Sequence, residues 1–312
     1  MEHYVTLFDS AFLPQGLALH ASMCRHAGPF LLWVLCMDDE VKAALDGMAI
    51  PSVKTVKLRD VETPELLAIK GGRNRAEYCW TLTPFTPKIV FDRDPQAERV
   101  TYVDADMYLL KSPAPIFDEF RASGKAVMIT DHAYDAEYDA SATSGQYCVQ
   151  FMTFVRGSSE GVRQWWQDRC VEWCFDRIED GKLGDQKYLD DWPTRFPEYV
   201  HVLSQIDVLL APWNARRFPY SRAIAWHFQG LRLLSGNRVL LHRGYSVPDI
   251  VNRMIYAPYM HELRNILENL REPVVQNVTK RGFILRAKYF ARNVRKLMRE
   301  LREYESVRKL PK

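Results

Sequence analysis

An almost entirely apolar run at residues 30–37, Phe-Leu-Leu-Trp-Val-Leu-Cys-Met, constrains the fold more than any other segment of the chain. Such a run is typical of a parallel strand that is buried on both faces. Strands and helices alternate around it: residues 3–8 and 52–58 predict strands, while residues 14–26 and the segment that Asp38 begins predict helices. This alternation predicts an α/β fold with a parallel sheet covered by helices.

The rest of the chain continues the alternation, without an internal repeat or a low-complexity linker. A Trp-rich segment at 159–178 predicts a long helix, and short strands are expected between residues 200 and 245. Further strand patterns occupy residues 100–103, 126–130 and 150–155.

The composition is typical of a compact enzyme. The 312 residues are 47% apolar, which is enough to bury one large core or two smaller ones. No apolar run reaches the roughly 18–20 residues that span a bilayer, and the chain opens directly on a strand pattern, so we expect no targeting leader. The six cysteines include no Cys-x-x-Cys pair, which favours reduced thiols in a cytoplasmic protein.

Two carboxylates separated by one residue, Asp104 and Asp106, directly follow the strand pattern at 100–103. Like charges at the end of a buried strand repel and lose hydration unless a cation compensates them. Such oxygen ligands suit Mg²⁺ or Mn²⁺, and α/β folds bind their ligands beyond the carboxyl ends of the strands. The pair therefore predicts a divalent metal site; the alternative is a solvated turn with two structural aspartates.

Four motifs occur in order along the chain: Phe8-Asp9-Ser10, Asp104-Ala-Asp106, Gly184-Asp185-Gln186 and His227-Phe-Gln-Gly230. In this set and order the chain resembles the GT-A glycosyltransferases, most closely the retaining enzymes of family 8 and their bacterial relatives. The resemblance covers residues 3–245 and implies a GT-A, Rossmann-like fold with a mixed, mainly parallel sheet flanked by helices. It also implies a nucleotide-diphosphate-sugar donor, with UDP favoured, and bound Mn²⁺ or Mg²⁺.

For the nucleotide, the resemblance places Phe8, Asp9 and Phe12 at the base and ribose end of a pocket. Asp9 would accept a hydrogen bond from a uracil N–H or a ribose hydroxyl, or would cap the following helix. The segment 73–84 would lie over the nucleotide, with Trp80 standing where the family has Arg; for its aromatic residues the alternative is a place in the core. The expected donor-site residues are Phe8, Asp9, Phe12, Arg75, Tyr78, Trp80, Asp104, Gln150, Gly230 and Arg232.

For the chemistry, the resemblance implies a cation that acts as a Lewis acid on the diphosphate leaving group. Asp185 and Gln186 would lie beside the anomeric carbon, and Asp131 would bind hydroxyls of the donor sugar. Transfer would retain the anomeric configuration by front-face attack; Asp185 as a covalent nucleophile or as a helix cap is the alternative. The expected metal ligands are Asp104, Asp106 and His227.

Two further positions depart from the family pattern, in addition to Trp80. The family usually has Lys a few residues after the Gly that aligns with Gly230, whereas this chain has Arg232, offset by one position. Arg also binds phosphate, with two hydrogen bonds at once. The family's Asn-x-Gly is replaced by Cys148-Val-Gln150, which predicts altered sugar selection or a weakened enzyme.

Residues 280–312 hold 12 Lys and Arg against 3 Asp and Glu. Apolar residues within 280–304 recur at helical spacing, which predicts a basic amphipathic helix for an anionic membrane surface; docking on the catalytic domain or a homodimer is the alternative. No nucleic-acid partner is expected, because no nucleic-acid-binding fold accompanies the charge. We therefore expect a catalytic domain at 1–272 and a basic helical extension at 273–312.

Together these features predict a metal-dependent, retaining glycosyltransferase of the hexosyltransferase type, acting on a saccharide or lipid-linked acceptor in bacterial surface polysaccharide synthesis. Its expected location is the cytoplasm, including the inner face of the cell membrane. A catalytically silent, membrane-attached scaffold and a sugar nucleotidyltransferase are the alternatives. Nucleotidyltransferases of this fold normally carry a Gly-rich basic loop after the first strand, and Phe8-Asp9-Ser10 offers neither feature.

Overall fold

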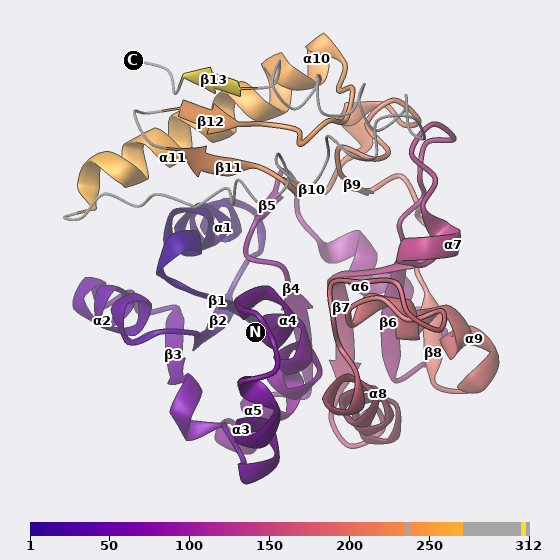
Figure 1. Cartoon of the computed structure of the whole chain (residues 1–312). Helices are drawn as coiled ribbons and strands as arrows, with labels where there is room; N and C mark the ends of the chain where they lie inside the picture. The colour runs from indigo at the N-terminus through magenta and orange to yellow at the C-terminus, as the bar shows by residue number, and fades with distance from the viewer. Residues whose placement is uncertain (235–237, 271–306, 310–312) are drawn as a thin grey trace, which may run out of the picture.

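The computed structural model describes residues 1–234, 238–270 and 307–309, and its centre is a seven-stranded sheet (Figure 1). The strand order is β3-β2-β1-β4-β7-β6-β8. β3, β2, β1 and β4 pair in parallel, and so do β6 and β8, whereas β7 is antiparallel to both β4 and β6. The strands are β1 Glu2–Phe8, β2 Phe30–Cys36, β3 Val53–Lys57, β4 Arg99–Val103, β6 Val127–Asp131, β7 Tyr147–Val155 and β8 Val200–Val202. The predicted mixed, mainly parallel α/β sheet is confirmed.

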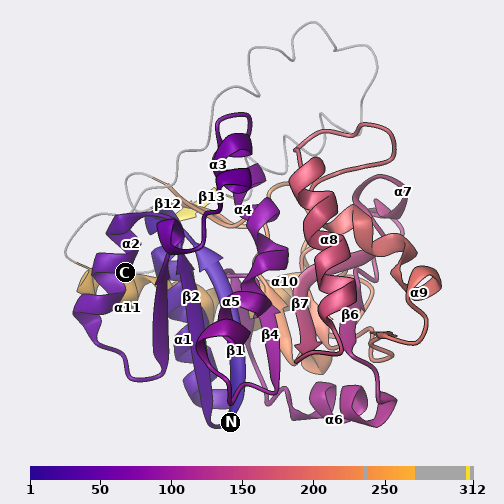
Figure 2. The same ribbon diagram turned by 90° about the horizontal axis from the view of Figure 1, so that it is seen from below.

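Helices cover both faces of this sheet (Figure 2). Successive residues of β1 point to opposite faces: Tyr4 packs into a core with Leu19 of α1, and Val5 packs into a second core with Val90 of α5. β2, the apolar run, is buried at every residue except Leu31. The longer helices are α1 Leu13–His26, α2 Asp39–Met48, α3 Pro64–Lys70, α4 Arg75–Leu82, α5 Thr86–Arg93, α6 Ala114–Ser123, α8 Glu160–Glu172 and α11 Ala257–Asn269.

Local sequence explains where these helices begin. The Asp38 carboxylate accepts a hydrogen bond from the Val41 N–H at 2.9 Å, which is the predicted cap of α2. Asn74 and Glu77 form a reciprocal capping box at the start of α4. This box fixes the first turn of the helix that forms one wall of the site described below.

Two small sheets lie beside the large one (Figure 1). In the first, β10 (Ala225–His227) lies between β5 (Met107–Leu109) and β9 (Leu209–Leu210), with His227 directly opposite Met107. In the second, β12 (Arg238–Leu240) pairs with β11 (Arg232–Leu234) and with β13 (Val307–Lys309). The pairing of β10 with β5 brings the segment after β4 next to residues far along the chain.

The helix predicted at 159–178 is shorter than expected. α8 ends at Glu172 because Trp173 takes an extended conformation, with φ −152° and ψ 122°. The carbonyl of Trp173 accepts a hydrogen bond from the Tyr188 hydroxyl at 2.8 Å, and its ring packs edge-on against Phe175. Tertiary packing of a large aromatic side chain therefore ends the helix where the local pattern would continue it.

The basic segment 280–304 lies outside the described residues, and so does the expected boundary at 273. Of the extension expected at 273–312, the described residues 307–309 form β13. In the described part of the chain, no helix combines the length and the apolar character needed to cross a membrane.

Candidate active site

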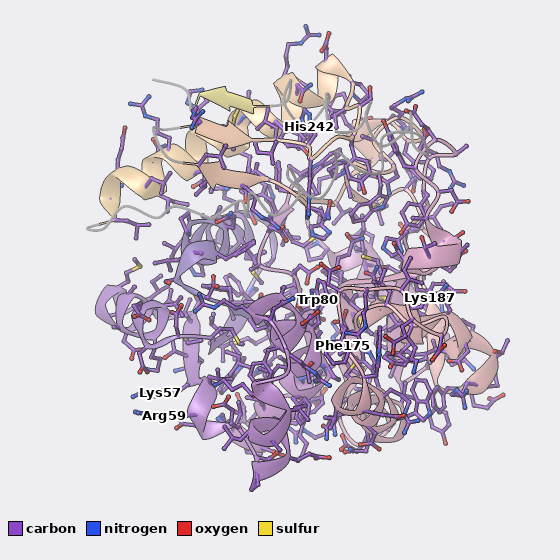
Figure 3. All side chains as sticks on the ribbon, in the orientation of Figure 1. Lys57, Arg59, Trp80, Phe175, Lys187 and His242 are labelled. Carbon is purple, nitrogen blue, oxygen red and sulfur yellow. The ribbon has the colours of Figure 1, made fainter. Side chains whose placement is uncertain are left out.

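A cavity of about 1190 Å³ opens at the carboxyl ends of β1 and β4, the edge of an α/β sheet where ligands bind. Its walls come from the ends of these strands, from α4, and from loops around residues 132–140, 183–186 and 243–245. Trp80, which lines it, lies near the middle of the molecule in Figure 3. The cavity is therefore built from segments distributed over most of the described chain.

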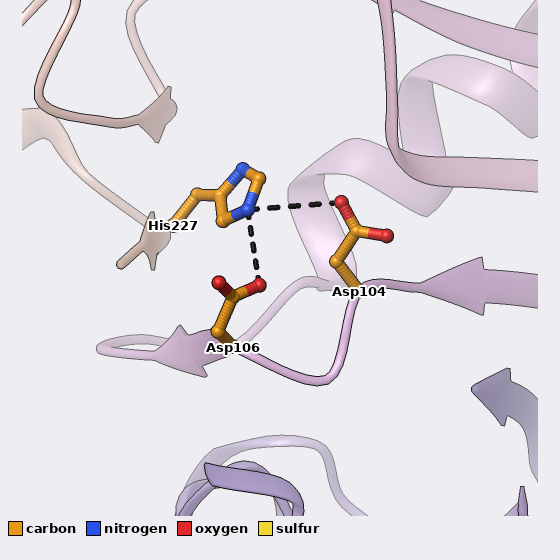
Figure 4. Close-up of side chains that lie close together, drawn as sticks. All are labelled: Asp104, Asp106 and His227. Atoms are coloured by element: carbon orange, nitrogen blue, oxygen red, sulfur yellow. Dashed lines mark ion pairs between the residues drawn. The ribbon is translucent and has the colours of Figure 1, made fainter. Parts of the chain in front are cut away.

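Asp104, Asp106 and His227 meet in this cavity (Figure 4). The His227 Nε2 atom lies 3.1 Å from Asp106 Oδ1 and 3.7 Å from Asp104 Oδ2. One potential ligand atom from each residue lies within 4.8 Å of the other two. The sequence prediction that these three side chains come together agrees with this geometry.

Backbone hydrogen bonds hold the three residues in place. The turn after β4 is closed by the Met107 N–H, which donates to the Asp104 carbonyl at 3.0 Å. The Phe228 N–H donates to the Asp106 carbonyl at 2.9 Å, which continues the pairing of β5 with β10. Because both carboxylates and the imidazole project from hydrogen-bonded backbone, the site is preorganised.

The charges of Asp104, Asp106 and His227 compensate one another only in part. Burial raises the pKa of Asp104, and the neighbouring Asp106 charge adds to this increase. For Asp106, burial acts in the same direction, but the charge of His227 and its hydrogen bond outweigh it, so that the pKa lies below its usual value. Burial lowers the pKa of His227, yet the two carboxylates more than reverse this, and the net shift is upward. The buried Asp106 and the partly buried Asp104, facing one imidazole, leave an excess of negative charge that a cation would neutralise.

Two arginines, Arg232 and Arg243, line the same cavity. Burial lowers the pKa of Arg232; the charge of Arg243 adds to this effect and Asp106 opposes it. The Arg232 guanidinium lies over the Phe12 ring, 5.0 Å from its centroid. Two guanidinium groups in one cavity suit a ligand with several negative charges, such as a diphosphate.

Asp185 and Gln186 also line the cavity, and Asp185 is only 3% exposed. Burial, and after it the Asp104 charge, raises the pKa of the Asp185 carboxyl to about 7. The Trp166 indole N–H donates to the Asp185 carbonyl at 2.9 Å, and the Gly184 N–H donates to the Phe175 carbonyl at 3.0 Å. Asp185 stands at the N-cap position of a 3₁₀ helix, Gln186–Asp191, but its side chain makes no capping bond. The helix-cap alternative therefore does not account for this carboxylate.

At the opposite end, Phe8, Asp9, Phe12 and Arg75 line the cavity. Asp9 Oδ1 accepts a hydrogen bond from the Phe12 N–H at 3.2 Å, so the capping role considered for it is present. The second Asp9 oxygen lies 3.1 Å from Arg75 Nε, and Arg75 also pairs with Asp38 at 3.0 Å. This end of the cavity thus presents aromatic rings beside an ordered ion-pair network.

Tyr78 does not line the cavity. Its ring is buried in the core with Leu82, and its hydroxyl donates to Glu62 Oε1 at 2.8 Å. Residues two apart on a helix face different directions, so α4 turns Trp80 towards the cavity and Tyr78 away from it. The structure places Tyr78 in the core, which is the alternative considered for it.

Asp131 also lies outside the cavity. It ends β6 and lines a separate hollow of about 170 Å³. Its carboxylate accepts hydrogen bonds from the Ala133 N–H at 2.6 Å and from the Gln146 amide. Its neighbour His132 faces the cavity instead, as expected for alternating side chains at a strand end.

Gln150 and Gly230, which were expected at the donor site, do not line the cavity. Gln150 is fully buried, and its Oε1 lies 2.8 Å from His227 Nδ1. Gly230 has φ +84°, and a Cβ there would lie 2.7 Å from the Arg243 Cβ. Both residues support groups that line the cavity rather than forming its wall.

Sequence reasoning missed a second group of aromatic side chains that line the cavity around His132. His132 stacks on Tyr134 with ring centroids 4.6 Å apart, and Trp213 meets His132 edge-on at 5.3 Å. Burial lowers the pKa of His132 to about 3, so its ring is neutral at pH 7. The signal in the sequence was limited to aromatic residues in three unconnected loops. The missed aromatic residues are His132, Tyr134, Tyr138, Trp213 and Tyr245.

No protein-family model matches the chain. Two uncharacterized proteins of Bacillus subtilis strain 168 are similar to it in sequence. YfnF is 27% identical over an alignment of 278 residues that covers 83% of this chain and 89% of YfnF. YfnD is 28% identical over an alignment of 289 residues that covers 86% of this chain and 91% of YfnD.

Solved structures of glycosyltransferases superpose on the chain. The bifunctional glycosyltransferase WbbM matches with a TM-score of 0.52 and 12% identity over 87% of this chain and 52% of WbbM. The galactosyltransferase LgtC, in complex with donor and acceptor sugar analogues, matches with a TM-score of 0.50 and 12% identity over 90% of this chain and 99% of LgtC. At such low identity the likeness establishes architecture, and by that architecture the chain has the GT-A fold of glycosyltransferases.

Proposed function

We propose that this protein is a metal-dependent glycosyltransferase that takes a sugar from a nucleotide-diphosphate donor, with UDP-sugars favoured. The observation that carries the proposal is the meeting of Asp104, Asp106 and His227 in a large cavity that Arg232 and Arg243 also line. Two carboxylates and one imidazole fit Mn²⁺, and fit Mg²⁺ less well because Mg²⁺ prefers oxygen ligands. The GT-A fold supports the same assignment.

Each charged group of the cavity has a role in this proposal. Asp104 and Asp106 would hold the cation through carboxylate oxygens and His227 through Nε2. When bound, the cation would supply Lewis-acid stabilisation of the leaving diphosphate. Arg232 and Arg243 would bind the diphosphate oxygens and neutralise the charge that develops as the glycosidic bond breaks.

For the sugar, we propose a place beside Asp185 and Gln186. Among the described residues, Asp185 Oδ2 is buried without a hydrogen-bond partner, so it is available to a sugar hydroxyl or to positive charge at the anomeric carbon. We also propose retention of configuration by front-face attack, in which a leaving phosphate oxygen takes the acceptor proton. The resemblance to retaining enzymes supports this stereochemistry, and an NMR assignment of the anomeric proton in the product tests it.

We propose a saccharide or lipid-linked sugar as the acceptor, as in bacterial surface polysaccharide synthesis. The proposed location is cytoplasmic, with the basic segment 280–304 attaching the protein to the inner face of the cell membrane or joining two copies. We retain a catalytic domain at 1–272 and a basic extension at 273–312 as the proposed organisation. The basic composition of the segment 280–312 supports the membrane proposal.

The first experiment is a calorimetric titration of UDP and GDP into the wild type and Asp106→Ala, each with and without Mn²⁺. We expect UDP binding that requires Mn²⁺ and disappears in Asp106→Ala, because that variant loses one of two carboxylate ligands. Donor hydrolysis with a panel of UDP-sugars then tests turnover. Binding without Mn²⁺ would contradict the proposed metal role. Failure of a folded protein to bind either nucleotide would favour the catalytically silent scaffold.

A further inference from the structure

Gln150 contacts two of the three candidate metal ligands from behind. It lies in β7, is fully buried, and accepts a hydrogen bond from the Asp104 N–H at its backbone carbonyl, at 3.1 Å. Its side-chain Oε1 lies 2.8 Å from His227 Nδ1. One residue therefore ties the end of β4 to the imidazole on β10 through two different groups.

The orientation of this amide decides what His227 can do. A neutral imidazole carries its proton on one nitrogen and a lone pair on the other. With the amide oxygen towards Nδ1, that nitrogen keeps a proton, and Nε2 faces Asp104 and Asp106, where a bound cation would take the place of the Nε2 proton. With the amide turned round, Nδ1 would accept, Nε2 would carry the proton, and His227 could not bind a cation at Nε2.

The surroundings hold the imidazole in place. Trp213 packs edge-on against the His227 ring with centroids 5.4 Å apart, which restricts rotation of the imidazole. Within the described residues, Gln150 Nε2 is buried and has no hydrogen-bond partner. Directing the amide oxygen at Nδ1 therefore leaves one buried amide N–H unpaired, at a cost in stability.

We propose that Gln150 is a positioning residue that fixes the Nδ1–H tautomer of His227 and thereby presents the Nε2 lone pair to a divalent cation. This inference rests on the metal site of the proposed function. It also reinterprets the departure noted in the sequence, because Gln150 stands where the resembling family has Gly. The substitution supplies an acceptor behind the imidazole instead of a contact with the donor sugar.

The test is a calorimetric titration of Mn²⁺ alone into the full-length, metal-free protein. We expect Gln150→Leu to weaken Mn²⁺ binding by about 10- to 100-fold, because partners that orient a ligating imidazole typically contribute that much affinity. Gln150→Glu keeps an acceptor at the same position and should bind Mn²⁺ at least as tightly as the wild type. Gln15→Leu is the matched control: Gln15 is equally buried, lacks side-chain partners among the described residues and does not line the cavity.

Thermal unfolding in the presence of a chelator separates positioning from a merely structural role. Gln150→Leu removes the unpaired Gln150 N–H but leaves the buried His227 Nδ1–H without its acceptor, so we expect a melting temperature lower by a few degrees at most. A 10- to 100-fold loss of Mn²⁺ affinity in a variant that still unfolds within a few degrees of the wild type is the expected signature. If Gln150→Leu fails to fold, Gln150→Glu decides, because weakened Mn²⁺ binding by a folded Gln150→Glu would overturn the inference.

Two outcomes distinguish this inference from the proposed function. If the wild type does not bind Mn²⁺, or Asp106→Ala binds it equally well, the metal site fails and the inference fails with it. If the wild type binds, Asp106→Ala does not, and Gln150→Leu binds like the wild type, only the role of Gln150 is overturned.

Discussion

Asp185 shows how one buried carboxyl is set apart from the other acids of the cavity. Asp104 and Asp106 face an imidazole, whereas Asp185 Oδ2 has no hydrogen-bond partner among the described residues. Burial, and then the charge of Asp104, raises its pKa from 3.8 to about 7. The carboxylate form is therefore held in the folded protein at an energetic disadvantage.

We predict that Asp185→Asn gains stability over the wild type as the pH rises. Between the unfolded pKa and the folded pKa, the native wild type binds more protons than the unfolded chain, so its stability falls with rising pH. From about pH 5 to about pH 7 the relative gain of Asp185→Asn should be about 2 kcal/mol, since one pKa unit is worth about 1.4 kcal/mol and the carboxyl is about half deprotonated at pH 7. Urea unfolding with a chelator measures it, and equal gains at both pH values would contradict it.

A second prediction at this scale concerns Arg243. Removing its charge in Arg243→Gln should weaken binding of UDP by about tenfold or more, because a charge-assisted hydrogen bond contributes about 1.5–3 kcal/mol. Uridine, which carries no phosphate, should be unaffected. Calorimetry with both ligands in Mn²⁺ checks this, with Arg59→Gln as control because Arg59 is exposed in the 3₁₀ helix Leu58–Asp60, away from the cavity (Figure 3). An equal loss for uridine would count against a phosphate contact.

At the scale of elements, the turn between β10 and β11 depends on Gly230. Its φ of +84° is a conformation that L side chains rarely adopt, and a Cβ would also collide with Arg243. Gly124, after α6, has a similar φ of +64° but no atom within 4 Å of such a Cβ. The two glycines share a backbone requirement and differ only in their surroundings.

We therefore predict that Gly230→Ala and Gly124→Ala both lose about 1–2 kcal/mol of stability through backbone strain. Only Gly230→Ala should also weaken UDP binding, because its Cβ displaces Arg243 from the cavity. Chemical unfolding and UDP titration of both variants check this. Full UDP affinity in Gly230→Ala would show that Arg243 tolerates the displacement.

The bounds of individual helices and strands show which structural features local sequence patterns can predict. The apolar run at 30–37 and the cap at Asp38 predicted β2 and α2 closely, because both signals are local. The end of α8 was predicted too late, since Trp173 leaves the helix to pack against Phe175 and to accept from Tyr188. Local spacing carries no information about the hydrogen bond from Tyr188, which lies in a later segment of the chain.

For the whole molecule, sequence motifs predicted the three side chains that meet at the centre of the cavity, but not its full wall. Tyr78 and Asp131 sit beside cavity residues in sequence, and they turn away because helices and strands alternate their faces. The aromatic group around His132, with Tyr134 and Trp213, comes from loops that are brought together only in the assembled sheet. No spacing rule connects such loops.

At the same scale, we predict that Mn²⁺ and UDP together raise the melting temperature of the wild type by several degrees. A ligand at a hundred times its Kd stabilises the native state by about 2.7 kcal/mol. Asp106→Ala should show no such increase, because it lacks a carboxylate of the proposed metal site. Scanning fluorimetry measures the shift, and an equal increase in Asp106→Ala would place ligand binding elsewhere.

The distance along the chain between the aspartates after β4 and the histidine in β10 has a consequence for biosynthesis. A ribosome releases Asp104 and Asp106 more than a hundred residues before His227, and β7, which holds Gln150, emerges in between. Asp104 and Asp106 must therefore stay exposed and hydrated until most of the chain has been translated. Capture of Mn²⁺ would then report that a newly made chain has completed its fold, which makes metal uptake a natural assay of maturation.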